Sequence, residues 1–334
     1  MLKNILITGG AGYVGTMLAY RLVSENKKVI IYDTFWYGEP KNLFFEIENK
    51  IKIVKADIRD LNSFEIAIKD NYVDCVIHLA CVSNDPSYEL NPDLGKSINY
   101  DCFENLVKIS KENGVKRFIY ASSSSVYGIK DEDQVTEDLS LEPLTDYSKY
   151  KALCEETLQK YIDKNFVGMI VRPATVCGFS KRLRLDLSVN ILTSHAYFKN
   201  KITIFGGEQY RPNLNIQDMI EFYIESLKYE SNLINGEIFN VGYENLKIKD
   251  IANKVKAIIK KNVEVQTTPS NDNRSYRITA KKIEKKLGFV PKHTVDNAIE
   301  SLYENFQNNR IEDPFENKMF YNVQVMKNIY ENKK

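Results

Sequence analysis

Short apolar runs alternate with longer amphipathic stretches through the first half of the chain. The strand-like runs are Asn4–Thr8, Lys28–Asp33, Ile51–Lys55, Cys75–Leu79, Arg117–Ala121 and Val167–Arg172. Stretches with apolar residues at helical spacing lie between them, most clearly Tyr13–Ser24, Ser97–Asn113 and Tyr147–Lys164. Strands that alternate with helices favour parallel pairing through right-handed crossovers. We therefore predict an α/β fold built on a doubly wound parallel sheet whose strands are buried on both faces.

The alternation becomes less regular after Cys177. The later helix-like stretches are Asp186–Tyr197, Gln217–Tyr229, Ile248–Lys260, Ala280–Leu287 and Val295–Phe306, and the later strands are Ile202–Phe205 and Ile238–Val241. The pattern indicates a smaller C-terminal lobe that is interleaved with returns of the chain to the first sheet. We expect one domain of residues 1–177 plus 212–242 and a substrate-binding lobe of residues 178–211 plus 243–334. The polar tail beyond Asn309 is left unassigned.

Composition and charge exclude several classes of protein. The 334 residues are 43% hydrophobic and 27% charged, and the formal net charge of +1 gives no basic surplus for nucleic acid. No run approaches the ~20 apolar residues that span a membrane, and no leader pattern precedes the first strand. Five widely spaced cysteines without a Cys-x-x-Cys pair favour free thiols in a reducing cytoplasm. His78, His195 and His293 are scattered and indicate no metal site.

A glycine-rich turn joins the first predicted strand to the first predicted helix. It reads Gly9-Gly10-Ala11-Gly12-Tyr13-Val14-Gly15. Gly9 permits a tight turn, Gly12 lets a pyrophosphate approach the helix N-terminus, and Gly15 allows close packing of helix on strand. The free N–H groups and the helix dipole favour an anion there. We predict a Rossmann dinucleotide-binding domain, with a plain strand-to-helix turn as the alternative.

A carboxylate at the end of the second predicted strand bears on the choice of dinucleotide. Asp33 lies 18 residues after Gly15, where it would accept hydrogen bonds from the adenosine ribose and repel a 2′-phosphate. Thr34, Phe35 and Trp36 follow it, with no arginine to hold such a phosphate. The sequence therefore predicts NAD in preference to NADP.

A second aspartate follows the third predicted strand. Asp57, in Ala56-Asp57-Ile58, would reach the adenine edge of a bound dinucleotide. Capping the helix that starts near Leu61 is an equally good interpretation.

Tyr147 and Lys151 lie four residues apart on one predicted helix. The same Tyr-x-x-x-Lys spacing also occurs at Tyr37/Lys41, Tyr197/Lys201, Tyr243/Lys247 and Tyr330/Lys334. Only the first pair follows a strand that ends in Ser122-Ser123-Ser124-Ser125, and ligands bind at the carboxyl ends of parallel strands. A tyrosinate can remove a hydroxyl proton while hydride leaves carbon, and a nearby lysine favours that phenolate. The alternative is a polar loop beside an exposed helix.

Taken together, these segments give a family resemblance over nearly the whole chain. The matching residues are Thr8–Gly15, Asp33, Ala56-Asp57, His78-Leu79-Ala80, Asn99, Ser122–Gly128, Tyr147/Lys151 and Arg172-Pro173. The chain resembles the extended short-chain dehydrogenases/reductases, in particular the NAD-dependent nucleotide-sugar epimerases and dehydratases. The resemblance implies that Ser123 acts with Tyr147 and Lys151, and that Ser124 touches substrate. It implies NAD contacts at Gly9, Gly12, Tyr13, Val14, Gly15, Asp33, Asp57, Ile58, Leu79, Ala80, Asn99, Tyr147, Lys151, Pro173 and Thr175.

The resemblance also implies that the second lobe holds a nucleotide diphosphate, which arginine side chains bind well. Expected substrate contacts are Ser83, Ser123, Ser124, Asn190, Arg211 and Arg274. Arg182 and Arg184 are further candidates to face the substrate. For each arginine, a solvated surface position is the alternative.

One subgroup is excluded by two serines. The similar 4,6-dehydratases carry Asp-Glu directly after the catalytic Ser or Thr, where this chain has Ser124 and Ser125. We therefore expect an NAD-dependent epimerase acting by transient oxidation of a sugar hydroxyl at C4, or a net 4-dehydrogenase or 4-ketoreductase. A non-catalytic dinucleotide sensor is a remote alternative, because a sensor needs no Tyr/Lys pair. The resemblance further implies a homodimer in which Ser97–Asn113 and Tyr147–Lys164 form a four-helix bundle.

Overall fold

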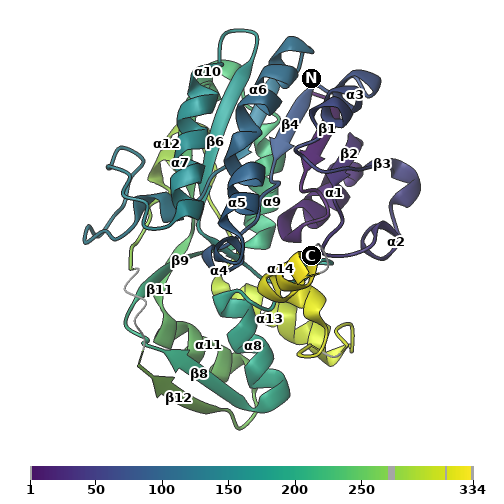
Figure 1. Cartoon of the computed structure of the whole chain (residues 1–334). Helices are drawn as coiled ribbons and strands as arrows, with labels where there is room; N and C mark the ends of the chain where they lie inside the picture. Colours follow the sequence, from purple (N-terminus) through teal and green to yellow (C-terminus); the bar gives the residue numbers. More distant parts are fainter. Residues whose placement is uncertain (1, 270–274, 313, 332–334) are drawn as a thin grey trace.

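Seven parallel strands form the central sheet of the computed structural model, which describes residues 2–269, 275–312 and 314–331 (Figure 1). The strands are β1 (Asn4–Thr8), β2 (Lys28–Asp33), β3 (Ile51–Lys55), β4 (Cys75–His78), β5 (Arg117–Ala121), β6 (Val167–Pro173) and β10 (Glu237–Val241). Their order is β10-β6-β5-β4-β1-β2-β3, so the winding reverses between β1 and β4. In such sheets the ligand crevice lies outside the carboxyl ends of the strands at this reversal. The predicted Rossmann-type α/β fold is confirmed.

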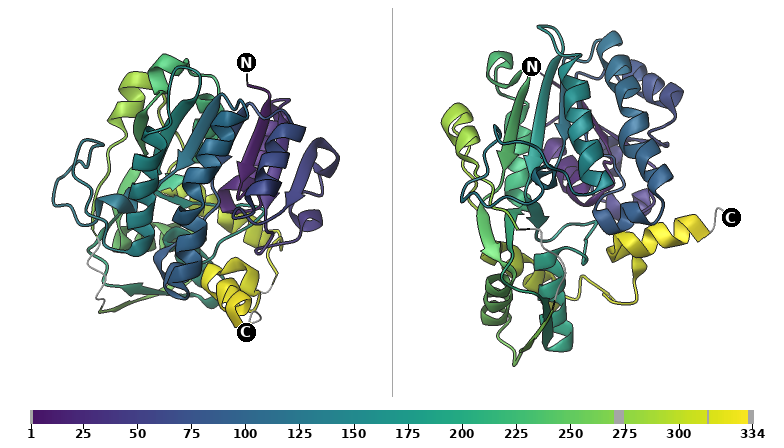
Figure 2. Two further views of the ribbon diagram at one scale, coloured as in Figure 1. Left: turned by 45° about the horizontal axis from the view of Figure 1, so that its top comes forward. Right: turned by 60° about the vertical axis from the view of Figure 1, so that its left-hand side comes forward.

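Helices cover both faces of this sheet (Figures 1 and 2). One face carries α1 (Tyr13–Ser24) and α9 (Ile216–Ser226), and the other carries α3 (Leu61–Asp70), α6 (Phe103–Glu112) and α7 (Asp146–Gln159). The shorter helices are α2 (Pro40–Leu43), α4 (Asp85–Glu89), α5 (Pro92–Lys96), α10 (Ser231–Ile234) and α12 (Lys281–Leu287). Because both faces are covered, the strands read as the continuous apolar runs seen in the sequence.

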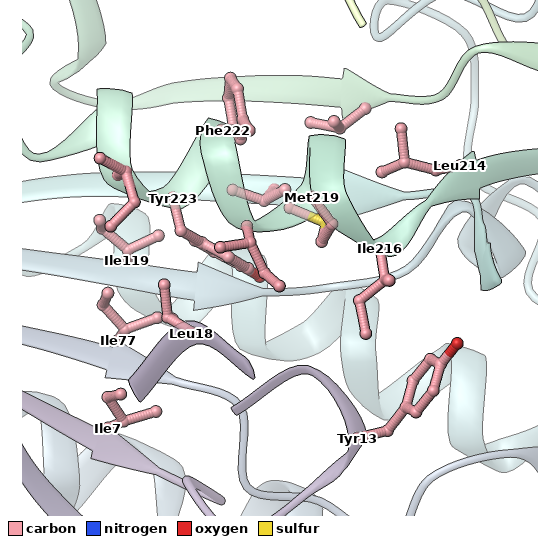
Figure 3. Packing of buried hydrophobic residues seen from close by; sticks show 14 of the residues in the cluster. Ile7, Tyr13, Leu18, Ile77, Ile119, Leu214, Ile216, Met219, Phe222 and Tyr223 are labelled. Carbon is pink, nitrogen blue, oxygen red and sulfur yellow. The ribbon is translucent and has the colours of Figure 1, made fainter. Parts of the chain in front are cut away.

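The face under α1 and α9 is filled with apolar side chains. Figure 3 shows Leu18, Met219 and Tyr223 from the two helices directed toward the strands. Ile77 lies on β4 and Ile119 on β5, and all five side chains are at most 1% exposed. Each buried side chain of this size contributes about 1.5–3 kcal/mol. This packing fixes the strand ends that carry the polar residues of the site.

Two short sheets and three longer helices lie outside the central sheet and the helices that cover it. The sheets are β11 (Glu244–Lys247)–β9 (Tyr210–Asn215)–β7 (Thr175–Cys177) and β12 (Glu264–Thr268)–β8 (Lys201–Phe205). The helices are α8 (Ser188–Lys199), α11 (Ile248–Ile259) and α13 (Val295–Gln307), and α8 packs against both of the others. These elements lie below the carboxyl end of the central sheet in Figure 1.

The prediction of one regular helix over Ser97–Asn113 is wrong, because a π turn occupies its first residues and α6 (Phe103–Glu112) follows that turn. The chain starts turning earlier, because the Asn91 side chain accepts a hydrogen bond from the Leu94 N–H (3.0 Å) and Pro92 begins α5. A π turn, Ser97–Asp101, then joins α5 to α6. Inside that turn, the Asn99 amide pairs with both backbone groups of Val82. A π turn holds one more residue than an α-helical turn, and such turns commonly occur next to functional sites.

Several other helix ends differ from the predicted ones, and two of these differences have a visible cause in the structure. α7 stops at Gln159, and Asp163 then accepts hydrogen bonds from the N–H groups of Asn165 and Phe166, which turn the chain into β6. α8 begins at Ser188 and not at Asp186, because the Asp186 carboxylate pairs with Arg184. Both shifts come from side-chain contacts that the apolar pattern does not record.

The polar tail contains a helix. A single 3-10 turn, Lys318–Phe320, leads into α14 (Asn322–Glu331), whose Val325 and Met326 are buried. α14 packs beside α4 at the carboxyl end of the sheet (Figure 1). In the described ranges, no helix has the length and apolar character needed to cross a membrane.

Candidate active site

A cavity of about 560 Å³ opens at the carboxyl ends of the parallel strands. Most of the residues predicted from the sequence line it: Gly9, Gly12, Tyr13, Val14, Gly15, Asp33, Asp57, Ile58, Leu79, Ala80, Ser83, Ser123, Ser124, Tyr147, Lys151, Pro173, Thr175 and Arg211. Asn99 and Asn190 are buried behind the wall, and Arg274 lies outside the described residues. The fold therefore brings the glycine turn and the Ser/Tyr/Lys group to one cavity.

The glycine turn has the close approaches that a dinucleotide site requires. Gly9 has a φ of +68°, and a Cβ there would lie 2.7 Å from the Ala80 nitrogen. A Cβ on Gly15 would lie 2.5 Å from the Gly9 carbonyl oxygen, so only glycine allows α1 to sit this close to the turn. Gly12 precedes the first residue of α1 and lines the cavity, where the free N–H groups of the helix favour an anion. These residues fit the diphosphate of a dinucleotide.

Asp33 is held at the end of β2 by two backbone groups. Its Oδ2 accepts from the Ala11 N–H (3.0 Å) and its Oδ1 from the Phe35 N–H (2.8 Å). Burial raises the pKa of this carboxyl, and those two hydrogen bonds and the charge of Arg182 oppose the rise. The carboxylate is thus fixed at the cavity wall with lone pairs left for ribose hydroxyls.

The capping interpretation of Asp57 is wrong. Asp60 caps α3, since its side chain accepts from the Ser63 N–H (3.0 Å). Asp57 lines the cavity instead and forms an ion pair with Arg59 (2.7 Å).

Tyr147 and Lys151 share one face of α7 and line the cavity, and Lys151 reaches the end of β5. A capping box at Thr145 starts this helix, which places Tyr147 in its first turn. Lys151 Nζ donates to the Ala121 carbonyl (2.6 Å) and lies 5.9 Å from the centre of the Tyr147 ring. The lysine is 3% exposed, so its charge acts on the phenol in a poorly solvated site.

The Tyr147 phenol is strongly perturbed by the cavity. Burial raises its pKa well above the ordinary value, and the charges of Cys81 and Asp85 raise it further. The charge of Arg184 and a hydrogen bond with Ser123 lower it. Positive charge supplied near the ring is therefore what makes proton removal possible at this residue.

The serine cluster divides into different roles. Ser123 Oγ lies 2.8 Å from Ser125 Oγ and contacts Tyr147, as expected of a residue that holds a reacting hydroxyl. Ser124 Oγ lies 3.1 Å from the Tyr276 hydroxyl, which joins the strand end to the lobe. Ser122 donates to Glu155, a contact that the sequence did not indicate.

A buried ion pair supports this part of the site. Glu155 of α7 binds Arg172 of β6 at 2.6 Å, and both side chains are under 5% exposed. The pair ties the helix that carries Tyr147 and Lys151 to the sheet. Arg172 was noted only as part of a family resemblance, and no spacing in the sequence pointed to Glu155.

Some of the predicted substrate contacts line the cavity, and Asn190 is buried behind its wall. Arg211 lines the cavity and its Nη1 donates to the Tyr210 carbonyl (3.0 Å). Ser83 also lines the cavity and accepts from Asn322 Nδ2 (2.7 Å). The Asn190 amide is fully buried and binds Gly178, Arg184 and the Tyr13 hydroxyl. Asn190 and Asn99 therefore shape the wall in this structure through backbone and side-chain contacts.

The predicted lobe and the tail contribute further cavity-lining residues, among them Arg182, Arg184, Asp186 and Asn322. Arg182 and Arg184 were candidates from the sequence, but Asp186 and Asn322 were not. No grouping of three or more His, Cys, Asp or Glu side chains in the described part of the chain could hold a metal ion.

Comparisons with known proteins agree with this arrangement. The profile of the NAD-dependent epimerase/dehydratase family matches residues 5–242. A UDP-glucose 4-epimerase of Lactobacillus helveticus is 28% identical over 324 residues, covering 90% of this chain and 96% of the relative.

Solved structures show the same fold. The UDP-glucuronic acid 4-epimerase of Bacillus cereus, in complex with UDP-glucuronic acid and NAD, has a TM-score of 0.80 and 25% identity, covering 91% of this chain and 99% of that one. The UDP-glucose 4-epimerase of Thermotoga maritima has a TM-score of 0.83 and 23% identity, covering 92% and 100%. With the matched profile, the glycine turn and the Ser/Tyr/Lys group in one cavity, NAD is the cofactor and this chain belongs to the NAD-dependent epimerase/dehydratase family.

Proposed function

We propose that the chain is a nucleotide-sugar 4-epimerase that transiently oxidises the C4 hydroxyl of its substrate. The observation that carries the proposal is the meeting of Tyr147, Lys151 and Ser123 in the cavity that the glycine turn and Asp33 also line. The relatives named above are 4-epimerases of UDP-sugars, which supports the same class of substrate here.

Each polar side chain has a task in this proposal. Tyr147 removes the hydroxyl proton and later returns it, Lys151 favours the phenolate, and Ser123 holds the reacting oxygen. NAD, which the glycine turn and Asp33 would hold, would supply the hydride acceptor and donor for this reaction. Arg211 and the predicted contact Arg274 bind the nucleotide diphosphate from the lobe.

Dehydration is disfavoured by the residues that follow Ser123. Both following positions are serines, so neither offers a carboxyl group as acid or base. Ser124 contacts Tyr276 and Ser125 contacts Ser123 instead. A net 4-dehydrogenase or 4-ketoreductase would use the same three residues and is the second outcome to be tested. We also propose a cytoplasmic enzyme, in keeping with five cysteines that are all free thiols.

One experiment separates these outcomes. Purified protein is incubated with UDP-, GDP-, CDP- and dTDP-sugars, products are identified by NMR, and NADH is followed by absorbance. An epimerase gives a C4-inverted sugar with no lasting change in NADH. Accumulation of NADH with a ketosugar would identify a dehydrogenase, and no reaction with any sugar nucleotide would contradict the proposal.

A further inference from the structure

Two buried arginines lie side by side in the wall of the cavity. Arg182 is 3% exposed and Arg184 is 9% exposed, and both line the cavity. Arg184 pairs with Asp186, with Nε 2.9 Å from Oδ1 and Nη2 3.1 Å from Oδ2. Within the described ranges, Arg182 forms no ion pair, and its Nε donates to no protein atom. A buried guanidinium without an acidic partner is costly unless a ligand supplies the anion.

The surroundings hold Arg182 in place without neutralising it. Its guanidinium lies 4.3 Å above the centre of the Tyr37 ring, and its Nη2 donates to Asn322 Oδ1 (2.6 Å). Burial and the charge of Arg184 lower its pKa to about 10, although the charges of Asp186 and Asp33 oppose this fall, so the side chain stays positive at neutral pH but would gain from an anion. The side chain is therefore preorganised to meet negative charge.

Contacts place the two arginines along the cavity beside α1. Arg182 stacks on Tyr37, which follows the end of β2 that carries Asp33, and the Arg184 carbonyl accepts a hydrogen bond from Asn190 Nδ2 (2.8 Å), which also donates to the Tyr13 hydroxyl. Their segment is attached to the first residue of α1, because Ser180 Oγ donates to the Tyr13 carbonyl (2.7 Å). The part of a dinucleotide that lies between its two ribose ends is the pyrophosphate. We infer that Arg182 and Arg184 bind the NAD pyrophosphate from the lobe side, opposite the N-terminus of α1, and that the C-terminal helix holds Arg182 in position.

The tail reaches this site through several hydrogen bonds. Asn322, at the start of α14, accepts from Arg182 and donates to Ser83 (2.7 Å). Its backbone N–H donates to Asp186 (3.2 Å), and the Leu185 N–H donates to the Phe320 carbonyl (2.9 Å). With Asn322 only 2% exposed, the tail closes the wall beside the cofactor. NAD should therefore leave slowly, whichever sugar reaction the chain catalyses.

The test measures cofactor binding and not turnover. Trp36 is the only tryptophan and lines the cavity, so quenching of its fluorescence reports NAD and NADH binding. Arg182→Met should weaken NAD binding by about 10- to 100-fold, the loss typical of a charge-assisted hydrogen bond. Arg182→Lys, which keeps the charge, should recover part of the affinity. UDP binding, followed by calorimetry, should stay within about twofold in both variants, since the proposed function assigns the nucleotide diphosphate to Arg211 and the predicted contact Arg274.

A neighbouring cation provides the matched control. Lys181 pairs with Glu46 at 3.0 Å and does not line the cavity, so Lys181→Met should leave NAD binding unchanged. Asn322→Asp keeps the shape of the residue but gives Arg182 a carboxylate partner, and it should weaken NAD binding and speed NADH release. This second variant keeps the test open if Arg182→Met unfolds.

Three results would overturn the inference. Arg182→Met could weaken UDP and leave NAD unchanged, which would assign the arginine to the substrate diphosphate. It could leave both ligands unchanged, or Lys181→Met could give the same loss as Arg182→Met. Because neither readout needs turnover, these results are independent of whether the chain proves to be an epimerase.

Discussion

At the scale of single residues, Tyr147 is the group on which the proposed chemistry depends. Tyr147→Phe should keep the fold and bound NAD, because the phenyl ring fills the same space and loses only the hydroxyl. Removing a general acid–base group typically costs ~10²–10⁴-fold in rate, so turnover should fall at least that far. Steady-state rates on the substrate found by the NMR panel measure the loss. Ser123→Ala should cost less, and near-normal activity of the phenylalanine variant would refute the assignment.

Lys151 should set the pH at which Tyr147 works. Burial already raises the Tyr147 pKa, and removing a positive charge beside the ring destabilises the phenolate further. In Lys151→Met the rising, acidic limb of the pH–rate profile should therefore move to higher pH, with slower turnover at neutral pH because less of the tyrosine is deprotonated. The profile of kcat against pH is compared with that of a Lys149→Met control, whose side chain is exposed on the same helix. An unshifted profile would show that the lysine only positions the ribose.

At the scale of elements, helix α7 is attached to the sheet by one buried ion pair. Glu155→Ala should lower the free energy of unfolding by about 3–5 kcal/mol, because Arg172 is left buried without a counter-charge. Glu155→Gln, which still accepts from Ser122, should lose less. Glu156 is exposed next to it, and Glu156→Ala should change stability by less than about 0.5 kcal/mol. Urea unfolding of the three variants measures these differences, and equal losses at both positions would contradict the argument.

Local patterns were enough to predict the sheet and the centre of the site. β1, β2, β3 and β5 have the bounds expected from their apolar runs, since a strand buried on both faces leaves a continuous signal. The glycine turn, Asp33 and Tyr147 could be found because each has a fixed offset from such a strand. The Arg182–Asn322 contact could not be found, because it joins positions far apart in sequence and depends on how the tail packs. The π turn before α6 could not be predicted for the same reason, since the Asn99–Val82 hydrogen bonds are tertiary contacts.

At the scale of the whole molecule, two helices side by side are the expected dimer surface. α6 and α7 pack together, and the half-buried Tyr100 and Tyr150 stack at 5.1 Å on this side of the molecule. We predict a dimer by light scattering at micromolar concentration, and a monomer for Leu153→Glu, which places a charge on the half-buried face of α7. Val290→Glu changes an exposed apolar residue before α13 and should remain dimeric. A monomeric parent protein would refute this interface.

The course of the chain through both parts shapes how the protein can be divided. We propose that residues 1–177 and 212–242 form the NAD-binding domain, and that residues 178–211 and 243–334 form the substrate lobe. Neither part is a continuous segment under this division. The tail then contributes to both, because the Asn322 amide binds Arg182 of the proposed lobe and Ser83 of the proposed NAD-binding domain.

The late position of β10 in the chain has a consequence for synthesis in the cell. β6 ends at Pro173, but its outer neighbour β10 begins only at Glu237, after the chain has passed through the lobe. Until the ribosome has released that strand, β6 presents a row of unpaired backbone groups beside a highly apolar run, which is a template for aggregation. Fragments that stop before Glu237 should accumulate as insoluble material even though they contain the glycine turn, Tyr147 and Lys151. The first half of the nascent chain is thus protected from aggregation only once β10, in the second half, has paired with β6.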